Sequence, residues 1–122
     1  MRGVAPDAFL INLRVLTAEG WGTVASLVDA IDWAIDHKAQ YNIRVINVSA
    51  GAPALQACQD DPACGAVQRC GRGGNRCRGG GGKQRAGGGW TAQICGAINR
   101  SGIAPEAITV GAVDTHGTPR AI

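Results

Sequence analysis

Five cysteines are the side chains of this sequence with the greatest potential for chemistry. They are Cys58, Cys64, Cys70, Cys77 and Cys95, separated by five, five, six and seventeen residues. No Cys-x-x-Cys pair occurs and the two histidines do not cluster with the cysteines, so no zinc site is predicted. A Cys58–Cys64 disulfide would suit an exported protein, but no secretory signal is visible near Met1, which argues against it. Because five is an odd number, at least one thiol has no partner within the chain.

The Arg/Gly-rich segment is a second candidate functional feature. Arg-Gly-Gly segments bind single-stranded nucleic acid through backbone charge and arginine stacking. Residues 71–89 carry five bases and no acid, whereas the remaining residues hold seven bases and nine acids. Trp90 is the only aromatic residue near this tract, and the repeats are irregular. Gly79–Gly82 beside Lys83 is not a phosphate-binding loop, because it lacks the Gly-Lys-Ser/Thr ending. Weak nucleic-acid binding by a small non-catalytic module is therefore kept as the alternative function, and no specific nucleic-acid partner is predicted.

The size and composition indicate one small domain or part of a larger one. The sequence has 122 residues, of which 45% are hydrophobic and only 4% aromatic, with a net charge of +3. No apolar run reaches the length of a membrane span, so no membrane partner is predicted.

The first half of the chain shows a strand–helix–strand pattern. Residues 9–16 are mostly apolar and predict a strand covered on both faces. Thr23 is a suitable N-cap for an amphipathic helix that we expect to reach about Ala39. Residues 44–48 form a second β-branched run, so the unit is βαβ and its strands are expected to be parallel.

The second half alternates regular and irregular patterns. Asp61 is expected to cap a helix that has Pro62 at its first position and ends near Arg69. Residues 71–89 contain ten glycines and one aliphatic side chain, so a disordered Gly/Arg-rich loop is predicted at about 70–90. Residues 107–113 are apolar again and predict a later strand. The expected fold class is α/β: a βαβ unit plus a later strand, with no strand between them.

Four blocks of this sequence resemble consecutive elements of the subtilisin-like serine proteases, the subtilase or S8 peptidase family. The resemblance extends over roughly two thirds of the chain, and it is clearest in Gly-Val-Ala-Pro-Asp-Ala at 3–8, in the helix that ends at 30–35, in Val-Ile-Asn-Val-Ser-Ala-Gly at 45–51 and in 104–112. The resemblance implies part of a parallel-sheet domain and an endopeptidase that acts on peptide substrates, without a cofactor. No oligomer is expected. Members of the family are commonly secreted, and the localisation of this chain is left open.

The catalytic triad that the resemblance implies has no counterpart in these residues. The family uses Asp, His and Ser in that order, and no Asp-Ser/Thr-Gly, His-Gly-Thr-His or Gly-Thr-Ser-Met-Ala motif occurs here. The sequence is therefore expected to lack the Asp/His and Ser regions, to contain no catalytic residue and to be inactive by itself. Asp114 and His116 follow the later strand, where the family has a surface loop, so His116 is expected to be an exposed loop residue. His37 is expected to act as a favourable charge at a helix C-terminus.

One functional element is implied by the resemblance. In the family, the Ser-x-Gly segment after the Ile-Asn strand pairs through its backbone with extended substrate, which is a β-augmentation. This places Ser49, Ala50 and Gly51 in the substrate-binding cleft. The middle residue is usually larger and apolar in the family, so Ala50 predicts a roomier subsite. The alternative interpretation is a strand end that turns into a loop.

The glycine-rich segment stands where the resemblance implies a buried valine-rich strand and then Ala-Gly-Asn, whose asparagine stabilises the oxyanion. Codons for residues 74–90, with CGN for arginine and read one base later, permit Gly-Ile-Val-Val-Val-Ala-Ala-Ala-Gly-Asn-Asn-Gly-Arg-Ala-Gly-Asp-Gly. This reading supplies both features in order. We therefore predict that residues 70–90 are a frame-shifted, low-complexity segment, with the frame restored near Trp90. Cys70 and Cys77 would then be by-products of the shift.

Overall fold

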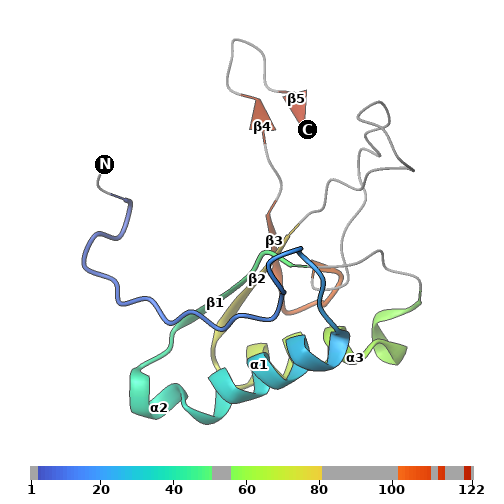
Figure 1. Ribbon diagram of the computed structural model, residues 1–122, viewed down its shortest axis with the longest axis horizontal. Coiled ribbons are helices and arrows are strands. Elements are labelled where there is room, and N and C mark those ends of the chain that lie inside the picture. The colour runs from blue at the N-terminus through green and yellow to red at the C-terminus, as the bar shows by residue number, and fades with distance from the viewer. Residues whose placement is uncertain (1–2, 51–55, 81–101, 111–112, 115–119, 122) are drawn as a thin grey trace.

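A three-stranded parallel sheet lies at the centre of the molecule, with β2 (Arg76–Gly80) between β1 (Val45–Val48) and β3 (Ile108–Val110) (Figure 1). The computed structural model describes residues 3–50, 56–80, 102–110, 113–114 and 120–121. Helix α3 (Pro62–Arg72) lies in the connection from β1 to β2, as parallel strands require a crossover. The predicted α/β fold with a parallel sheet is confirmed.

Helix α1 (Val24–Asp36) begins where its sequence predicts. The Thr23 hydroxyl accepts a hydrogen bond from the backbone N–H of Ser26 at 3.0 Å, which satisfies one of the free donors of the first turn. The expected continuation to Ala39 is interrupted at His37, and a separate single-turn helix, α2 (Lys38–Tyr41), follows. Helix α2 ends at Asn42, whose φ of 52° is left-handed, a conformation that asparagine tolerates better than most residues.

Helix α3 also begins as predicted and ends three residues later than expected. The Asp61 carboxylate accepts a hydrogen bond from the Ala63 N–H at 2.9 Å, and Pro62 is the first helical residue. The helix continues past Arg69 to Arg72. A short 3-10 helix, η1 (Cys58–Asp60), precedes it.

The hydrophobic core lies between one face of the sheet and the two long helices, which Figure 1 shows together on the same side of the strands. Alternate residues of β1 and β2 are buried: Ile46 is half-buried, and Val48, Cys77 and Gly79 are buried. The buried cluster consists of Ile31, Val48, Cys64, Ala66, Val67, Cys70, Cys77 and Ala104. The other sheet face presents Val45, Asn47, Arg76, Arg78 and Ile108, all exposed. A parallel sheet is normally covered on both faces, whereas no described helix packs on this second face.

Polar contacts also join α1 to α3, and α2 to the residue that follows α3. Arg69 donates hydrogen bonds to both carboxylate oxygens of Asp32 at 2.8 Å. Lys38 donates to the carbonyl oxygen of Gly73, the C-cap of α3. Both partners of the Arg69–Asp32 pair are about half exposed, so we expect this pair to contribute about 0.2–1 kcal/mol.

The prediction of a disordered loop at about 70–90 is wrong for residues 70–80. Residues 70–72 are the last residues of α3, and Arg76–Gly80 form β2, the central strand. The prediction was based on side-chain composition, whereas a central strand is held by backbone hydrogen bonds to neighbouring strands on both sides. The predicted absence of a central strand is therefore also wrong. Residues 81–90 lie outside the described residues.

The predicted strand at residues 9–16 is not observed. This segment has no regular secondary structure, and Phe9 and Leu10 are almost fully exposed. Apolar composition favours burial, but a strand also needs a hydrogen-bonded neighbour. The only strand that β1 pairs with is β2, within the part of the chain that the structure describes.

The later strand is found, and a short antiparallel pair follows it. Strand β3 covers Ile108–Val110 of the predicted 107–113, and residues 111–112 lie outside the described part. Strands β4 (Val113–Asp114) and β5 (Arg120–Ala121) pair with each other. Of the residues that the structure describes, none belongs to a helix that is long and apolar enough to span the bilayer.

Two disulfides connect four of the five cysteines. Cys58 is bonded to Cys64, and Cys70 to Cys77. The sequence-based argument against the first pair is thus wrong, because the fold of η1 onto α3 brings its Cα atoms within 5.3 Å. The second pair was not predicted, since Cys77 was assigned to a loop rather than to a strand beside α3. Cys95 lies outside the described residues.

Candidate functional site

The carboxyl end of β1 carries the predicted substrate-binding residues. Ser49 and Ala50 follow Val48 directly, and Ser49 is exposed whereas Ala50 is half-buried. Gly51 lies outside the described residues. In open parallel sheets, ligands bind outside the carboxyl ends of the strands, because loops diverge there and leave backbone groups accessible. The structure therefore brings Ser49 and Ala50 to the edge of the sheet at which ligand binding is expected.

A side-chain hydrogen bond orients Ser49. The Asn47 amide Nδ2 donates to the Ser49 Oγ at 2.8 Å. Residues two apart in an extended segment point to the same side, so Asn47 and Ser49 lie together on the open face of the sheet. Asn47 was not predicted as a site residue, although its spacing of two residues from Ser49 is a signal that could have identified it.

Glycines of β2 lie beside this edge. Val48 of β1 is in register with Gly79 of β2, and Gly80 is in register with Val110 of β3. No side chain of β2 therefore projects next to Ser49 and Ala50 at the end of the sheet. The absence of side chains on Gly79 and Gly80 leaves room beside this edge, which a binding mode based on main-chain hydrogen bonds needs.

A mostly apolar cavity of about 320 Å³ adjoins the same edge. Its walls come from residues 13–16, from α1 and from β1, and they include Ser49 and Ala50. The small side chain of Ala50 leaves part of this volume open. The unpaired segment at 13–16 forms one wall instead of a strand, so the cavity lies where that segment does not pack closely against β1.

The described hydrogen bonds do not join a nucleophile to a base. Ser49 Oγ bonds to Asn47, whereas His37 Nδ1 donates to the Trp33 carbonyl oxygen at 2.8 Å. The His37 ring also stacks on Trp33 with the ring centroids 4.1 Å apart. The hydrogen bond places His37 at the last carbonyl groups of α1, as expected for a residue near a helix C-terminus. His116 lies outside the described residues.

Within the described residues, no group of three His, Cys, Asp or Glu side chains is placed so that it could hold a metal ion. Four of the cysteines are occupied by disulfides. The edge at Ser49 and Ala50 thus combines one oriented hydroxyl with an adjoining apolar cavity. Such an arrangement can hold an extended peptide but cannot by itself break a bond.

Comparisons with known proteins match nearly the whole chain. The family model described as the Subtilase family matches residues 1–120. Serine protease AprX of Bacillus subtilis (strain 168) is 32% identical over 138 aligned residues, which cover 96% of this chain and 26% of AprX. Subtilisin DY of Bacillus licheniformis is 41% identical over 51 residues, or 42% of this chain and 17% of that protein.

Among solved structures, the chain is similar to sphericase. The TM-score is 0.77 at 27% sequence identity, and the superposition covers 98% of this chain and 36% of sphericase. Nearly all of this chain is therefore matched, whereas it spans only about a quarter to a third of the length of AprX and sphericase.

Proposed function

Because this chain belongs to the subtilase family, we propose that it supplies the sheet scaffold and one wall of the substrate cleft of a serine endopeptidase. The observation that carries the proposal is the position of Ser49 and Ala50 at the carboxyl end of β1, within a match that extends over residues 1–120. The substrate is an extended peptide, and the reaction of the whole protease is hydrolysis of its peptide bonds.

Ser49, Ala50 and Gly51 bind the substrate in this proposal, and none of them reacts with it. An extended peptide adds a strand along the edge through main-chain hydrogen bonds, while its side chains occupy the neighbouring subsites. The cavity beside Ala50 accepts a bulky apolar side chain. The Asn47–Ser49 hydrogen bond holds the end of β1 in one conformation, which lowers the entropic cost of binding.

The 122-residue chain alone is expected to show no serine-hydrolase activity, because nucleophile, base and orienting acid must lie within hydrogen-bond reach. A fluorophosphonate probe, which reacts with activated serines, should not label the folded chain above its heat-unfolded background. AprX serves as the positive control, and an AprX chimera that carries residues 3–51 of this chain should also be labelled. Fold-dependent labelling of the isolated chain would show that it is active. A folded chimera without labelling would contradict the proposed scaffold role.

We also propose that a one-base frameshift in the gene altered the sequence of residues 70–90. Support comes from β2, which occupies Arg76–Gly80, where the shifted reading supplies Val-Val-Val-Ala-Ala. Central parallel strands are normally rich in Val, Ile and Leu, and two arginines in such a strand are unusual. Further support comes from Asn75, which is buried without hydrogen-bond partners for its amide and becomes Ile or Thr in the shifted reading.

The codons of residues 74–90 test this proposal directly. Read one base later, they should encode an Ile/Val-rich run at 75–78, small residues at 79–82 and an asparagine pair at 83–84. Codons for charged residues at 76 and 78–80 in the shifted frame would exclude a displaced strand. The preceding codons for residues 44–48 act as the control, because they should give an apolar strand only in the present frame.

No observation on the described residues favours the alternative function of nucleic-acid binding. Arg76 and Arg78 belong to the central strand rather than to a loop. Trp90, the aromatic residue nearest to them in sequence, lies outside the described part. Binding of single-stranded nucleic acid through stacked aromatic side chains therefore has no basis in this structure.

A further inference from the structure

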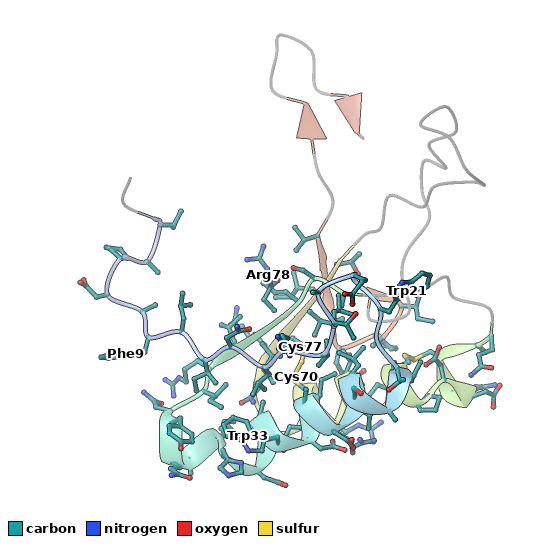
Figure 2. All side chains as sticks on the ribbon, in the orientation of Figure 1. Phe9, Trp21, Trp33, Cys70, Cys77 and Arg78 are labelled. Carbon is teal, nitrogen blue, oxygen red and sulfur yellow. A yellow bond between two sulfur atoms is a disulfide. The ribbon has the colours of Figure 1, made fainter. Side chains whose placement is uncertain are left out.

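The two disulfides hold opposite ends of α3. Cys58–Cys64 joins η1 to the first turn of the helix, and Cys70–Cys77 joins its last turns to β2 (Figure 2). The Cα atoms of Cys70 and Cys77 are 6.5 Å apart, within the range that a disulfide spans. Both side chains of this second pair are fully buried within the core cluster.

Strand β2 depends on Cys77 for its attachment to the helices. The side chains of Arg76 and Arg78 are exposed, and Gly79 has no side chain. Cys77 is therefore the one side chain of β2 that belongs to the core cluster, and it is covalently bonded to α3. An ordinary central strand would pack two or three aliphatic side chains in the same place. In this chain the Cys70–Cys77 disulfide provides most of the attachment of β2 to the helices.

The residue before β2 weakens the attachment further. Asn75 is 4% exposed, and neither its Nδ2 nor its Oδ1 has a hydrogen-bond partner among the described residues. A buried polar group without partners favours conformations in which it reaches water. Without the Cys70–Cys77 bond, Asn75 would therefore promote the separation of β2 from α3.

Loss of β2 would affect the whole sheet. The strand order is β1-β2-β3, so in the described sheet each outer strand pairs only with β2. Separation of β2 leaves the backbone groups of β1 and β3 without their ladders. It also removes the support of the edge at Ser49 and Ala50.

We propose that the Cys70–Cys77 disulfide is a redox latch that holds β2, and with it the parallel sheet, onto α3. The reductant is a dithiol. Its thiolate attacks one sulfur of the latch to form a mixed disulfide, and the other cysteine leaves as a thiolate that takes up a proton. The second thiol of the reductant then releases the first cysteine and closes its own disulfide. Two electrons and two protons pass to the protein, and the sheet loses its anchor.

The two disulfides should be reduced in a fixed order. Thiol–disulfide exchange requires access of the attacking thiolate to a sulfur. Cys58 is half-buried, whereas Cys70 and Cys77 are 0% exposed, so the Cys58–Cys64 bond reacts first. The latch reacts only when β2 opens locally, and its reduction then makes that opening permanent.

The test compares two variants of the full chain, both carrying Cys95→Ser so that the fifth thiol does not exchange with either disulfide. The latch-only variant adds Cys58→Ala and Cys64→Ala. The matched control keeps Cys58–Cys64 and carries Cys70→Ala and Cys77→Val, which preserve an apolar core. Each is treated with dithiothreitol, alkylated with N-ethylmaleimide and analysed by hydrogen–deuterium exchange of β1 and β3. The mass gain counts the reduced cysteines.

Reduction of the latch-only variant is expected to speed amide exchange in β1 and β3 by about tenfold or more, in step with alkylation of two cysteines. Reduction of the control should leave exchange in these strands unchanged. Unchanged exchange in the latch-only variant after both cysteines are alkylated would overturn the proposal. Alkylation of Cys70 and Cys77 before any reductant is added would overturn it as well, because the latch would then not exist.

Discussion

Replacing Asn75 by leucine is expected to raise the free energy of unfolding by about 1–3 kcal/mol, the cost of a buried polar group without partners. Asn75 is 4% exposed, and both polar atoms of its amide lack hydrogen bonds. Leucine has the same branched shape, so it removes the desolvation cost without creating a cavity. The backbone hydrogen bond from Asn75 to the Cys70 carbonyl is unaffected. Urea denaturation followed by circular dichroism measures the change.

Two further variants test whether the effect of Asn75→Leu depends on burial of the side chain. Asn47 is exposed, so Asn47→Leu should change the free energy of unfolding by no more than about 0.5 kcal/mol. Asn75→Asp places a charge in the same buried position and should lower it. If Asn75→Leu proved neutral or destabilising, the amide would have partners in solution. Asn75→Ile should stabilise in the same way, and isoleucine is a residue that the shifted reading permits here.

Replacing Ile31 by alanine is expected to lower the free energy of unfolding by about 2–5 kcal/mol, the usual range for removing a large aliphatic side chain from a core. Ile31 is 2% exposed and lies in α1, where it packs in the cluster that contains Val48 of β1 and Val67 of α3. A cavity would open between three elements. Since α3 is held by disulfides near both ends, it has little freedom to close that cavity.

Ile11 supplies a control with the same substitution. It is 45% exposed and lies outside any helix or strand, so Ile11→Ala should change the free energy of unfolding by at most about 0.5 kcal/mol. Urea denaturation of the two variants, side by side with the parent chain, gives the comparison. Equal losses in both would mean that α1 does not pack on the sheet through Ile31.

Local signals were sufficient for the helix starts. Thr23 and Asp61 accept the hydrogen bonds that capping residues are expected to accept, and Pro62 takes the first helical position. These interactions connect residues two or three apart, so they are visible in the sequence. The β-branched run at 44–48 likewise becomes β1, because its apolar residues also match the burial that the fold provides.

Two elements could not be assigned correctly from composition. Residues 9–16 are apolar but form no strand, and residues 76–80 are polar and glycine-rich but form the central strand. Arg76–Gly80 pair on both sides, with β1 and β3, whereas residues 9–16 pair with no strand in the described part of the chain. Backbone ladders depend little on side-chain type, so the composition of a segment does not show whether a ladder is available to it.

The candidate site was likewise only partly predictable from the sequence. The positions of Ser49 and Ala50 just after a parallel strand were predictable, since a strand and its exit are adjacent in sequence. The register that places Gly79 beside Val48, and the contact of residues 13–16 with the cavity, depend on segments far apart in the chain.

Disulfide pairing was the feature that the sequence predicted least well. Their spacing and odd number were compatible with several pairings or none, and the most direct sequence argument was against a disulfide. Pairing requires two Cα atoms within about 7 Å, and that proximity arises only when η1 and β2 fold against α3.

The sequence by itself thus determined the family, the helix starts, β1 and the position of Ser49 and Ala50 directly after it, because short-range hydrogen bonds and motif order carry that information. Only the tertiary structure decided that Arg76–Gly80 is the central strand and that Cys77 joins it to α3. These features depend on backbone pairing and on proximity between distant segments, which residue types do not encode.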